Sequence, residues 1–420
     1  MLNLQPSARV SPKREGRLAA LDGLRLVAAL LVVSYHYVGT ERSHLWESPN
    51  HQVFSHLYGL ATYGNLGVQL FFLVSGFVIC MSSWGRKLSD FLISRIVRLF
   101  PMYWVAIVVS FMVVRLNRDT ADQVQVIFHV DTLSDLLTNF TMAQDALGAP
   151  NVDQVYWTLW VELRFYLLFA AVVALGVTYR RVLAFCGLWM AAAILTGAFH
   201  YPIVDLIVQP AYAPYFVTGI LLYLVHRFGS TPLLWGLIGL CLLVAQHQLL
   251  IDVRVNSIYN GHSLHWLYAV ALVGGFFALV AAVALGWLSW ARWRWLTVAG
   301  ALTYPLYLMH QDIGIIFIYS MKGIIAPWPL LAITVLGMLV IAYLGHRLVE
   351  RPFAPMFKRA LRRGFDAIDR ADGPRRREVV TPKPEPLVAS ADRQSVEPLP
   401  ADPDPGPDPR EESRLVANSG

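Results

Sequence analysis

The sequence predicts an all-α integral membrane protein: a bundle of about ten transmembrane helices followed by a disordered C-terminal tail. Its composition, its long apolar stretches and the charges of the loops between them support this fold class. Of the 420 residues, 56% are hydrophobic and 15% are charged, against about 45–50% and about 25% in soluble domains. This shift is expected in a bilayer, because unpaired charge is costly in hydrocarbon.

About ten stretches are long and apolar enough to cross a bilayer, whose hydrocarbon core needs about 20 helical residues. They lie at 18–39, 66–84, 100–116, 157–176, 182–199, 212–226, 232–250, 265–286, 299–320 and 328–348. The sixth is the weakest, because Pro210 and Pro214 can interrupt its start.

The loop charges orient the bundle. With a cytoplasmic N-terminus, the inner loops carry Arg86, Lys87, Arg95, Arg98, Arg180, Arg181, Arg227, Arg292 and Arg294, and the outer loops carry Arg42, Arg118, Arg254 and Lys322. The excess of basic residues inside predicts a multi-pass protein of the inner (cytoplasmic) membrane with both termini cytoplasmic. The net charge of +6 therefore favours anionic lipid or an anionic cofactor as partner, and not nucleic acid.

The chain divides into three parts by composition. Residues 1–17 form a short basic cytoplasmic segment, and 18–363 form the transmembrane domain. Residues 364–420 are Pro-rich, charged and almost free of aromatics, which predicts a disordered cytoplasmic tail.

The first span carries charges that are rare inside a membrane. Arg25 and His36 lie eleven residues apart, close to three helical turns, so they share a face. Asp22 and Arg25 are spaced i,i+3 and can pair. The alternative is a structural ion pair with a hydrogen-bonded core histidine.

Polar groups also lie where an inner loop enters the third span and within the fourth span. Arg95 and Arg98 share one face, and two guanidiniums suit a phosphate group, although positive-inside anchoring is by itself the more common explanation. Glu162 lies within the fourth span with Tyr166 one turn on, where a carboxylate can orient a histidine, bind a hydroxyl or form a salt bridge between helices. Asp22, Ser75, Tyr166 and His310 are candidates for the substrate cavity, with helix packing as the alternative for Ser75 and core burial as the alternative for His310.

Together these motifs resemble the bacterial acyltransferase type 3 family of membrane O-acyltransferases, which modify surface polysaccharides, nodulation factors and macrolides. The matching stretches are LDGLRLVAALLVVSYH at 21–36, GVQLFFLVSGFVI at 67–79, SRIVRLFPMYW at 94–104, YWTLWVELRFYLL at 156–168, YPLYLMHQ at 304–311 and VERPF at 349–353. The family hallmarks are an arginine and a histidine separated by ten residues, matched by Arg25 and His36, and an Arg-x-x-Arg pair, matched by Arg95 and Arg98.

The sequence also departs from the family pattern. Where relatives often carry a serine before the valine–glutamate pair and Glu-Gln after it, this chain has Trp160, Leu163 and Arg164. The hydrolase-like domain that follows the spans in many relatives is not expected here, so the chain resembles the standalone members.

The resemblance implies transfer of an acyl group, acetyl in the first instance, from acyl-CoA as co-substrate to a hydroxyl of a carbohydrate, glycolipid or secondary-metabolite acceptor. Arg95 and Arg98 would bind the coenzyme A phosphates, and Arg25 would continue that anchoring. His36 would act as general base and Glu162 would orient it. Direct attack and an acyl-histidine intermediate both stay open. No metal and no tightly bound cofactor are expected.

A transporter or flippase is the alternative hypothesis, because intramembrane Arg, Glu and His residues also line transport pathways. The sequence shows no convincing internal repeat of the kind common in transporters. A membrane scaffold is a third class, but it would not explain costly charges in the first and fourth spans.

Overall fold

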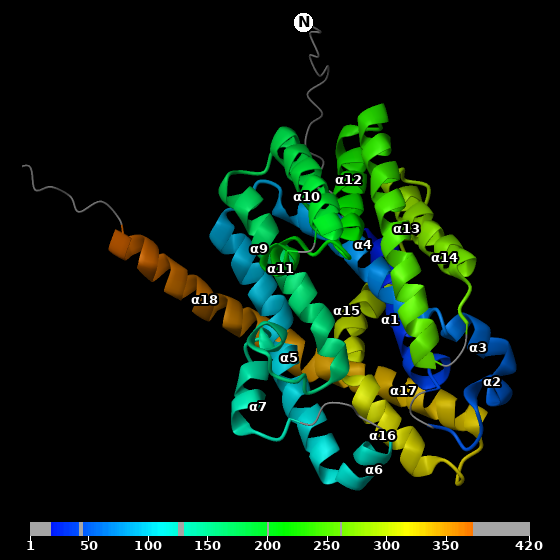
Figure 1. The fold of residues 1–420 in the computed structure, drawn as a ribbon. Coiled ribbons are helices and arrows are strands. Elements are labelled where there is room, and N and C mark those ends of the chain that lie inside the picture. Colours follow the sequence, from blue (N-terminus) through cyan, green and yellow to red (C-terminus); the bar gives the residue numbers. More distant parts are fainter. Residues whose placement is uncertain (1–17, 42–44, 125–129, 200, 261–262, 373–420) are drawn as a thin grey trace, which may run out of the picture. The chain divides into compact units, whose positions relative to one another are not determined.

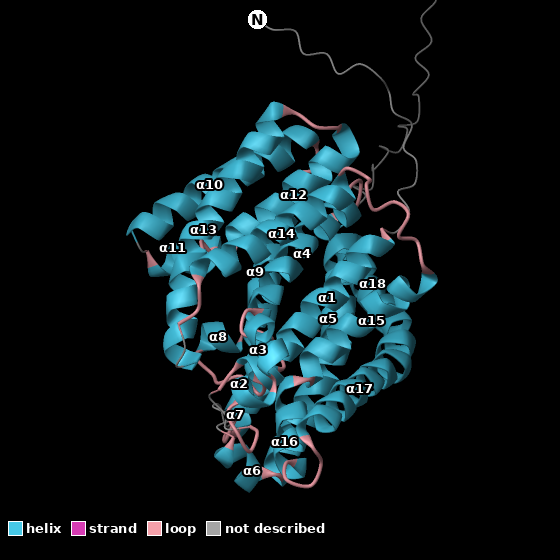
Figure 2. Ribbon diagram, turned by 90° about the vertical axis from the view of Figure 1, so that its right-hand side faces the viewer, coloured by secondary structure: helices cyan, strands magenta, loops and turns pink. Residues whose placement is uncertain are grey.

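A computed structural model describes residues 18–41, 45–124, 130–199, 201–260 and 263–372 of the chain. The chain separates into two units, 1–371 and 372–420, and all the elements below belong to the first, apart from the last residue of the last helix. Within the described residues every regular element is a helix and no strand occurs, as Figure 2 shows. This confirms the predicted fold class.

The helices follow one another along the chain with short connections. The first half holds α1 (Ala19–Ser34), the π-helix η1 (Tyr35–Gly39), α2 (Asn50–Val53), α3 (Ser55–Ala61), the 3₁₀-helix η2 (Gly64–Leu66), α4 (Gly67–Ser83), α5 (Leu88–Leu116), α6 (Arg118–Gln123), α7 (Leu133–Asn139), α8 (Gln144–Leu147), the 3₁₀-helix η3 (Gln154–Tyr156), α9 (Trp157–Ala174) and α10 (Tyr179–Phe199). The second half holds α11 (Pro202–Val208), α12 (Ala213–Phe228), α13 (Pro232–Asn260), α14 (Trp266–Ala284), α15 (Arg294–Met309), α16 (Gln311–Met321), α17 (Pro327–Gly345), the π-helix η4 (His346–Glu350) and α18 (Arg351–Asp372). Figure 1 labels most of them.

Nine helical segments among the described residues are long and apolar enough to cross a membrane. They correspond to nine of the ten predicted spans. The other, predicted as one helix at 299–320, is broken at His310 into α15 and α16. The His310 backbone keeps helical angles (φ −75°, ψ −34°), and the residue is fully buried between the two helices.

The last helix extends further than the sequence suggested. The predicted tail begins at Gly364, but α18 continues to Asp372. Phe357, Leu361 and Phe365 recur every four residues and are half-buried, so one apolar face runs across the predicted boundary. The predicted N-terminal segment 1–17 and the tail from 373 onward lie outside the described residues.

The closest helix packing is between α4 and α12. A Cβ added to Gly219 would lie 2.0 Å from the carbonyl oxygen of Leu73, and one added to Gly76 would lie 2.1 Å from that of Phe216. Two glycines therefore let the two backbones touch, as small residues commonly do between membrane helices.

The first helix lies against both α4 and α15 and brings the functional side chains into the middle of the bundle. Gly300 of α15 packs directly on the Asp22 side chain, since a Cβ there would lie 2.5 Å from the Asp22 Cβ. After Ser34 the helix widens into the π-helix η1. Such π-turns frequently occur at functional sites, and this one carries His36.

The contact between α4 and α12 can be tested by adding one methyl group. Gly219→Ala should lower the midpoint of thermal unfolding in detergent, because a Cβ has only backbone to displace and overpacking costs about 1–3 kcal/mol. Gly274→Ala on α14 is the matched control, since no atom lies within 4 Å of its added Cβ. Equal midpoints for the two variants would contradict the described packing.

Candidate active site

A cavity with an empty volume of about 580 Å³ lies between α1, α4, α5, α9 and α15. Its walls are largely apolar, with Phe71 and Phe72 among them, but charged and hydroxyl side chains converge on it. The polar and charged lining residues are Arg25, Ser75, Arg98, Thr158, Glu162, Thr303, Tyr304 and Tyr307. Small-molecule sites typically combine an apolar cavity with a few placed polar groups.

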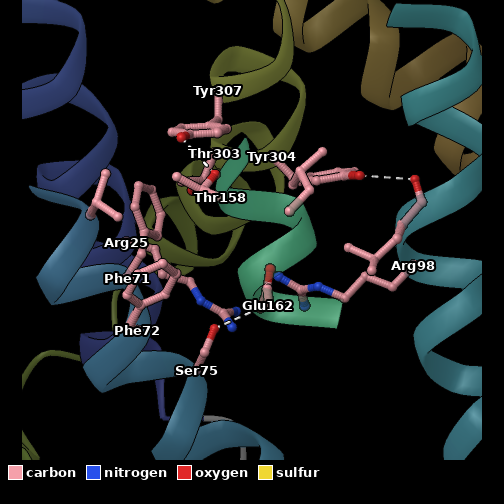
Figure 3. A pocket seen from close by; sticks show the side chains of 13 residues that line it. Arg25, Phe71, Phe72, Ser75, Arg98, Thr158, Glu162, Thr303, Tyr304 and Tyr307 are labelled. Carbon is pink, nitrogen blue, oxygen red and sulfur yellow. Dashed lines mark hydrogen bonds between the residues drawn. The ribbon is translucent and has the colours of Figure 1, made fainter. Parts of the chain in front are cut away.

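Glu162 is the centre of the polar network in this cavity. Ser75 Oγ donates to Glu162 Oε1 over 2.7 Å, and the hydroxyl of Tyr166 donates to the same oxygen. Figure 3 shows the guanidinium groups of Arg25 and Arg98 directed toward this carboxylate from opposite sides. Four side chains that the sequence singled out, Arg25, Ser75, Arg98 and Glu162, thus line one cavity, and Tyr166 binds there.

The two arginines of the Arg-x-x-Arg pair occupy different positions. Arg98 lines the cavity. Arg95 instead lies over the ring of Tyr166, with 5.8 Å between its guanidinium carbon and the ring centroid, and its Nε donates to Ser94 Oγ. Of the two arginines predicted to share a phosphate site, only Arg98 is among the residues that line this cavity, while Arg95 packs on Tyr166, which bonds to Glu162.

A second cavity, with an empty volume of about 910 Å³, shares Arg25, Arg98 and Tyr304 with the first. Arg351, His346 and Glu350 also line it, and His346 Nδ1 lies 2.7 Å from Glu350 Oε2. Arg25 and Arg98 therefore stand between two adjoining spaces, one lined mainly by apolar and hydroxyl groups and one rich in charge.

His36 does not contact Glu162 as the sequence suggested. Its Nδ1 lies 2.9 Å from Nε2 of His310, and the two ring centroids are 5.1 Å apart. The predicted orientation of His36 by Glu162 is thus replaced by a histidine pair. The physical reason is the break after α15, which turns the His310 ring toward η1, whereas Glu162 already accepts two hydrogen bonds from α4 and α9.

Tyr307 connects the cavity to the histidine pair. Its ring lines the cavity and lies 5.8 Å from the ring of His310, centroid to centroid. Its hydroxyl is 2.7 Å from Thr158 Oγ1. Figure 3 places Tyr307 and Thr158 at one end of the cavity, with Glu162 and Ser75 toward the other.

Two further predicted residues complete this description. Asp22 is buried and attracts Arg25 electrostatically, as its i,i+3 spacing suggested. Arg164, the departure from the family pattern, lies over the Trp160 ring and donates to the backbone carbonyl of Leu206 over 2.6 Å. Arg164 is not among the residues that line the cavity, and the hydrogen bonds of Glu162 come from Ser75 and Tyr166.

Sequence reasoning missed several residues of the site. Tyr304 and Tyr307 precede His310 by six and three residues, so their spacing on α15 could have placed them beside it. Asp153 and Asp312 are both buried, and the Asp312 backbone N–H donates to Asp153 Oδ2 over 3.4 Å. That contact joins residues far apart in sequence and had no local signal. In the described part of the chain, no group of three or more His, Cys, Asp or Glu residues could hold a metal ion.

Comparison with known proteins finds several relatives in sequence. An acyltransferase (MdmB) of Streptomyces mycarofaciens is 28% identical over 196 residues, covering 45% of this chain and 48% of its own length. The peptidoglycan O-acetyltransferase OatA of Listeria monocytogenes is 27% identical over 165 residues, covering 36% of this chain and 23% of its own length. A Bacillus subtilis protein, YrhL, which is named as a putative peptidoglycan O-acetyltransferase, is 22% identical over 375 residues, covering 80% of this chain and 54% of its own length.

The chain thus spans about half or less of the length of these relatives. No solved structure gives a significant match. A family model described as an acyltransferase domain matches residues 18–347, a range that contains both the cavity side chains of the 580 Å³ space and the histidine pair. Because that match covers most of the sequence, the chain belongs to the acyltransferase type 3 family.

Proposed function

We propose that this chain is a membrane O-acyltransferase that transfers an acetyl or similar acyl group from acyl-CoA to a hydroxyl of a carbohydrate or glycoconjugate. The observation that carries the proposal is the cavity that runs from Arg25 and Arg98 to Tyr307, beside the His36–His310 pair. It offers an anion-binding end, an apolar middle and a base. Relatives named as an acyltransferase and a peptidoglycan O-acetyltransferase support the reaction class.

The donor site follows from the charges. Coenzyme A carries phosphate groups, which guanidinium groups bind through charge-assisted hydrogen bonds. Arg98 and Arg351 line the larger cavity, next to Arg25. In this proposal the phosphates occupy the larger cavity and the acyl-pantetheine arm extends past Arg25 into the smaller one. The basic loops that favour a cytoplasmic position for this side fit a cytoplasmic donor and an inner-membrane location.

His36 acts as the general base on the acceptor. It removes the proton of the acceptor hydroxyl while the oxygen attacks the thioester carbonyl; the new C–O bond forms, the C–S bond breaks, and the coenzyme A thiolate leaves and takes up a proton. A neutral imidazole is suited to this transfer near pH 7. If the acyl group first transfers to His36, a C–N bond to the ring forms as the C–S bond breaks and the thiolate leaves; the acceptor oxygen then attacks, the C–O bond forms, the C–N bond breaks, and the ring takes up the acceptor proton.

Glu162 has a different role from the one the sequence suggested. Its carboxylate lies between Arg25 and Arg98 and accepts from Ser75 and Tyr166. A carboxylate in this position compensates the buried cation of Arg25, whose isolated burial would be costly, and it also faces the exposed Arg98. We infer that Glu162 holds the two arginines in place for the donor.

Removal of the base provides the first test. His36→Ala should lower acyl release from radiolabelled acetyl-CoA by about 100-fold or more while coenzyme A binding is retained, because the donor site lies elsewhere. The measurement uses membranes with matched expression, and His226→Ala serves as control, since His226 bonds the carbonyl of Ala284 on other helices. Equal activity of wild type and His36→Ala would refute the base assignment. Transport of an unmodified glycan without turnover would instead support a transporter.

The phosphate assignment makes a second prediction. Arg98→Ala should raise the KM for acetyl-CoA about tenfold or more, because a hydrogen bond to a charged group contributes about 1.5–3 kcal/mol. The KM for S-acetylpantetheine, which lacks the phosphates, should change much less. Arg86→Ala, an exposed arginine in the loop after α4, is the charge-matched control. A uniform loss with both donors would place Arg98 outside the phosphate site.

A further inference from the structure

The hydrogen bonds of His310 bear on the protonation of the neighbouring His36 ring. We propose that His310 is a positioning residue that fixes the tautomer of His36: it holds the hydrogen of the His36 ring on Nδ1 and leaves the lone pair of Nε2 free as the base. The catalytic use of this tautomer rests on the proposed function, but the tautomer itself does not.

The argument begins at the far side of the His310 ring. Nδ1 of His310 lies 2.8 Å from the carbonyl oxygen of Tyr307 and 3.2 Å from that of Leu306. A carbonyl oxygen can only accept a hydrogen bond, so this nitrogen carries the hydrogen. In a neutral imidazole the other nitrogen, Nε2, then has no hydrogen and can only accept.

The second step passes to His36. Its Nδ1 lies 2.9 Å from Nε2 of His310. Since that nitrogen of His310 is an acceptor, the hydrogen between the rings belongs to His36 Nδ1, and Nε2 of His36 holds the lone pair. No hydrogen bond to this Nε2 occurs among the described residues, and the His36 side chain is only half-buried, so a substrate hydroxyl can approach it.

The alternative is a His310 that carries hydrogens on both nitrogens. His310 has no exposed surface, and its ring nitrogens face only two backbone carbonyls and His36. The nearby Asp153 and Asp312 side chains make no hydrogen bond to the ring in the described structure. An unpaired buried cation costs several kcal/mol, so the neutral form is the stable one.

The surrounding helices hold the rings of His36 and His310 in contact. His310 occupies the break between α15 and α16, and the hydroxyl of Tyr37 donates to its backbone carbonyl over 2.6 Å. A Cβ added to Gly314 would lie 1.9 Å from that hydroxyl, so α16 closes tightly on Tyr37. His36 and Tyr37, neighbours in the π-helix η1, thus both bond to His310, one at its ring and one at its carbonyl.

This arrangement assigns His310 the orienting task that the sequence had given to Glu162. The hydrogen bond made by one ring nitrogen of a histidine generally decides which nitrogen stays free. Here the orienting group is neutral, and two backbone carbonyls fix it in turn.

Nitrogen NMR tests the tautomer directly and does not depend on turnover. Full-length protein labelled with nitrogen-15 histidine is measured at mildly alkaline pH, and the His36 signals are those lost in His36→Ala. In wild type we expect hydrogen on Nδ1 and none on Nε2. His310→Gln should keep this pattern because its amide oxygen can accept from His36, whereas His310→Leu should move the hydrogen to Nε2. A His36 hydrogen on Nε2 in wild type would overturn the proposal.

Steady-state kinetics tests whether the orientation of His36 by His310 affects turnover. His310→Leu should lower kcat about 100-fold with little change in the KM for acetyl-CoA, and His310→Gln should restore most of kcat. In the His36→Ala background, His310→Leu should have almost no further effect, because residues that act through one another are not additive. His226→Gln is the matched control. Additive losses, or equal losses in the Gln and Leu variants, would show a merely structural role.

The two proposals can fail separately. A wild-type protein with hydrogen on His36 Nδ1 but without acyl release from acetyl-CoA would uphold the tautomer and refute the proposed function. An active enzyme with hydrogen on His36 Nε2 would do the reverse.

Discussion

The carboxylate of Glu162, placed between Arg25 and Arg98, is the interaction on which the central cavity depends. The guanidinium of Arg25 is buried, and without a counter-charge it would be costly in hydrocarbon, so it depends on the nearby carboxylate of Glu162. Ser75 and Tyr166 fix the carboxylate by donating to one of its oxygens, and Arg95 packs on Tyr166. The network joins α1, α4, α5 and α9, and so connects the charged side chains of the cavity to the packing of the bundle.

The broken helix at His310 meets a second demand of the bilayer. Backbone that leaves the helical ladder must be satisfied within the protein. Near His310 the Tyr156 hydroxyl donates to the carbonyl of Leu308 and the Asp312 N–H donates to Asp153 Oδ2, while the His310 carbonyl accepts from both the Gly314 N–H and the Tyr37 hydroxyl. The segment therefore stays bonded within the protein, and its histidine side chain contacts His36. The π-helix η1 contributes the facing half of the contact.

The charged groups and the histidine pair occupy different places in the bundle. Arg25 and Arg98 border the larger, charge-rich cavity, while His36 contacts His310, whose ring lies beside Tyr307 of the smaller cavity. The Tyr307–Thr158 pair lies between the cavity and the histidines and would have to admit the acyl group.

The sequence by itself predicted the features that depend on residues close together in the chain. Apolar stretches of sufficient length predicted the nine membrane-length helices found among the described residues, and the i,i+3 spacing of Asp22 and Arg25 predicted their attraction. The motifs indicated the family, and they singled out Arg98 and Glu162 for different roles, although both line one cavity. The extension of α18 past Gly364 was also present in the spacing of Leu361 and Phe365, but the polar composition of the tail masked it.

Only the tertiary structure decided the partners across helices. The pairing of His36 with His310 joins residues 274 positions apart, and it depends on a π-turn and a helix break that no propensity or periodicity marks. The same holds for Glu162, whose hydrogen bonds go to Ser75 and Tyr166 and not to His36. Sequence spacing specifies which residues share a face of one helix, whereas the rotation and contact of different helices follow from how all their side chains pack together.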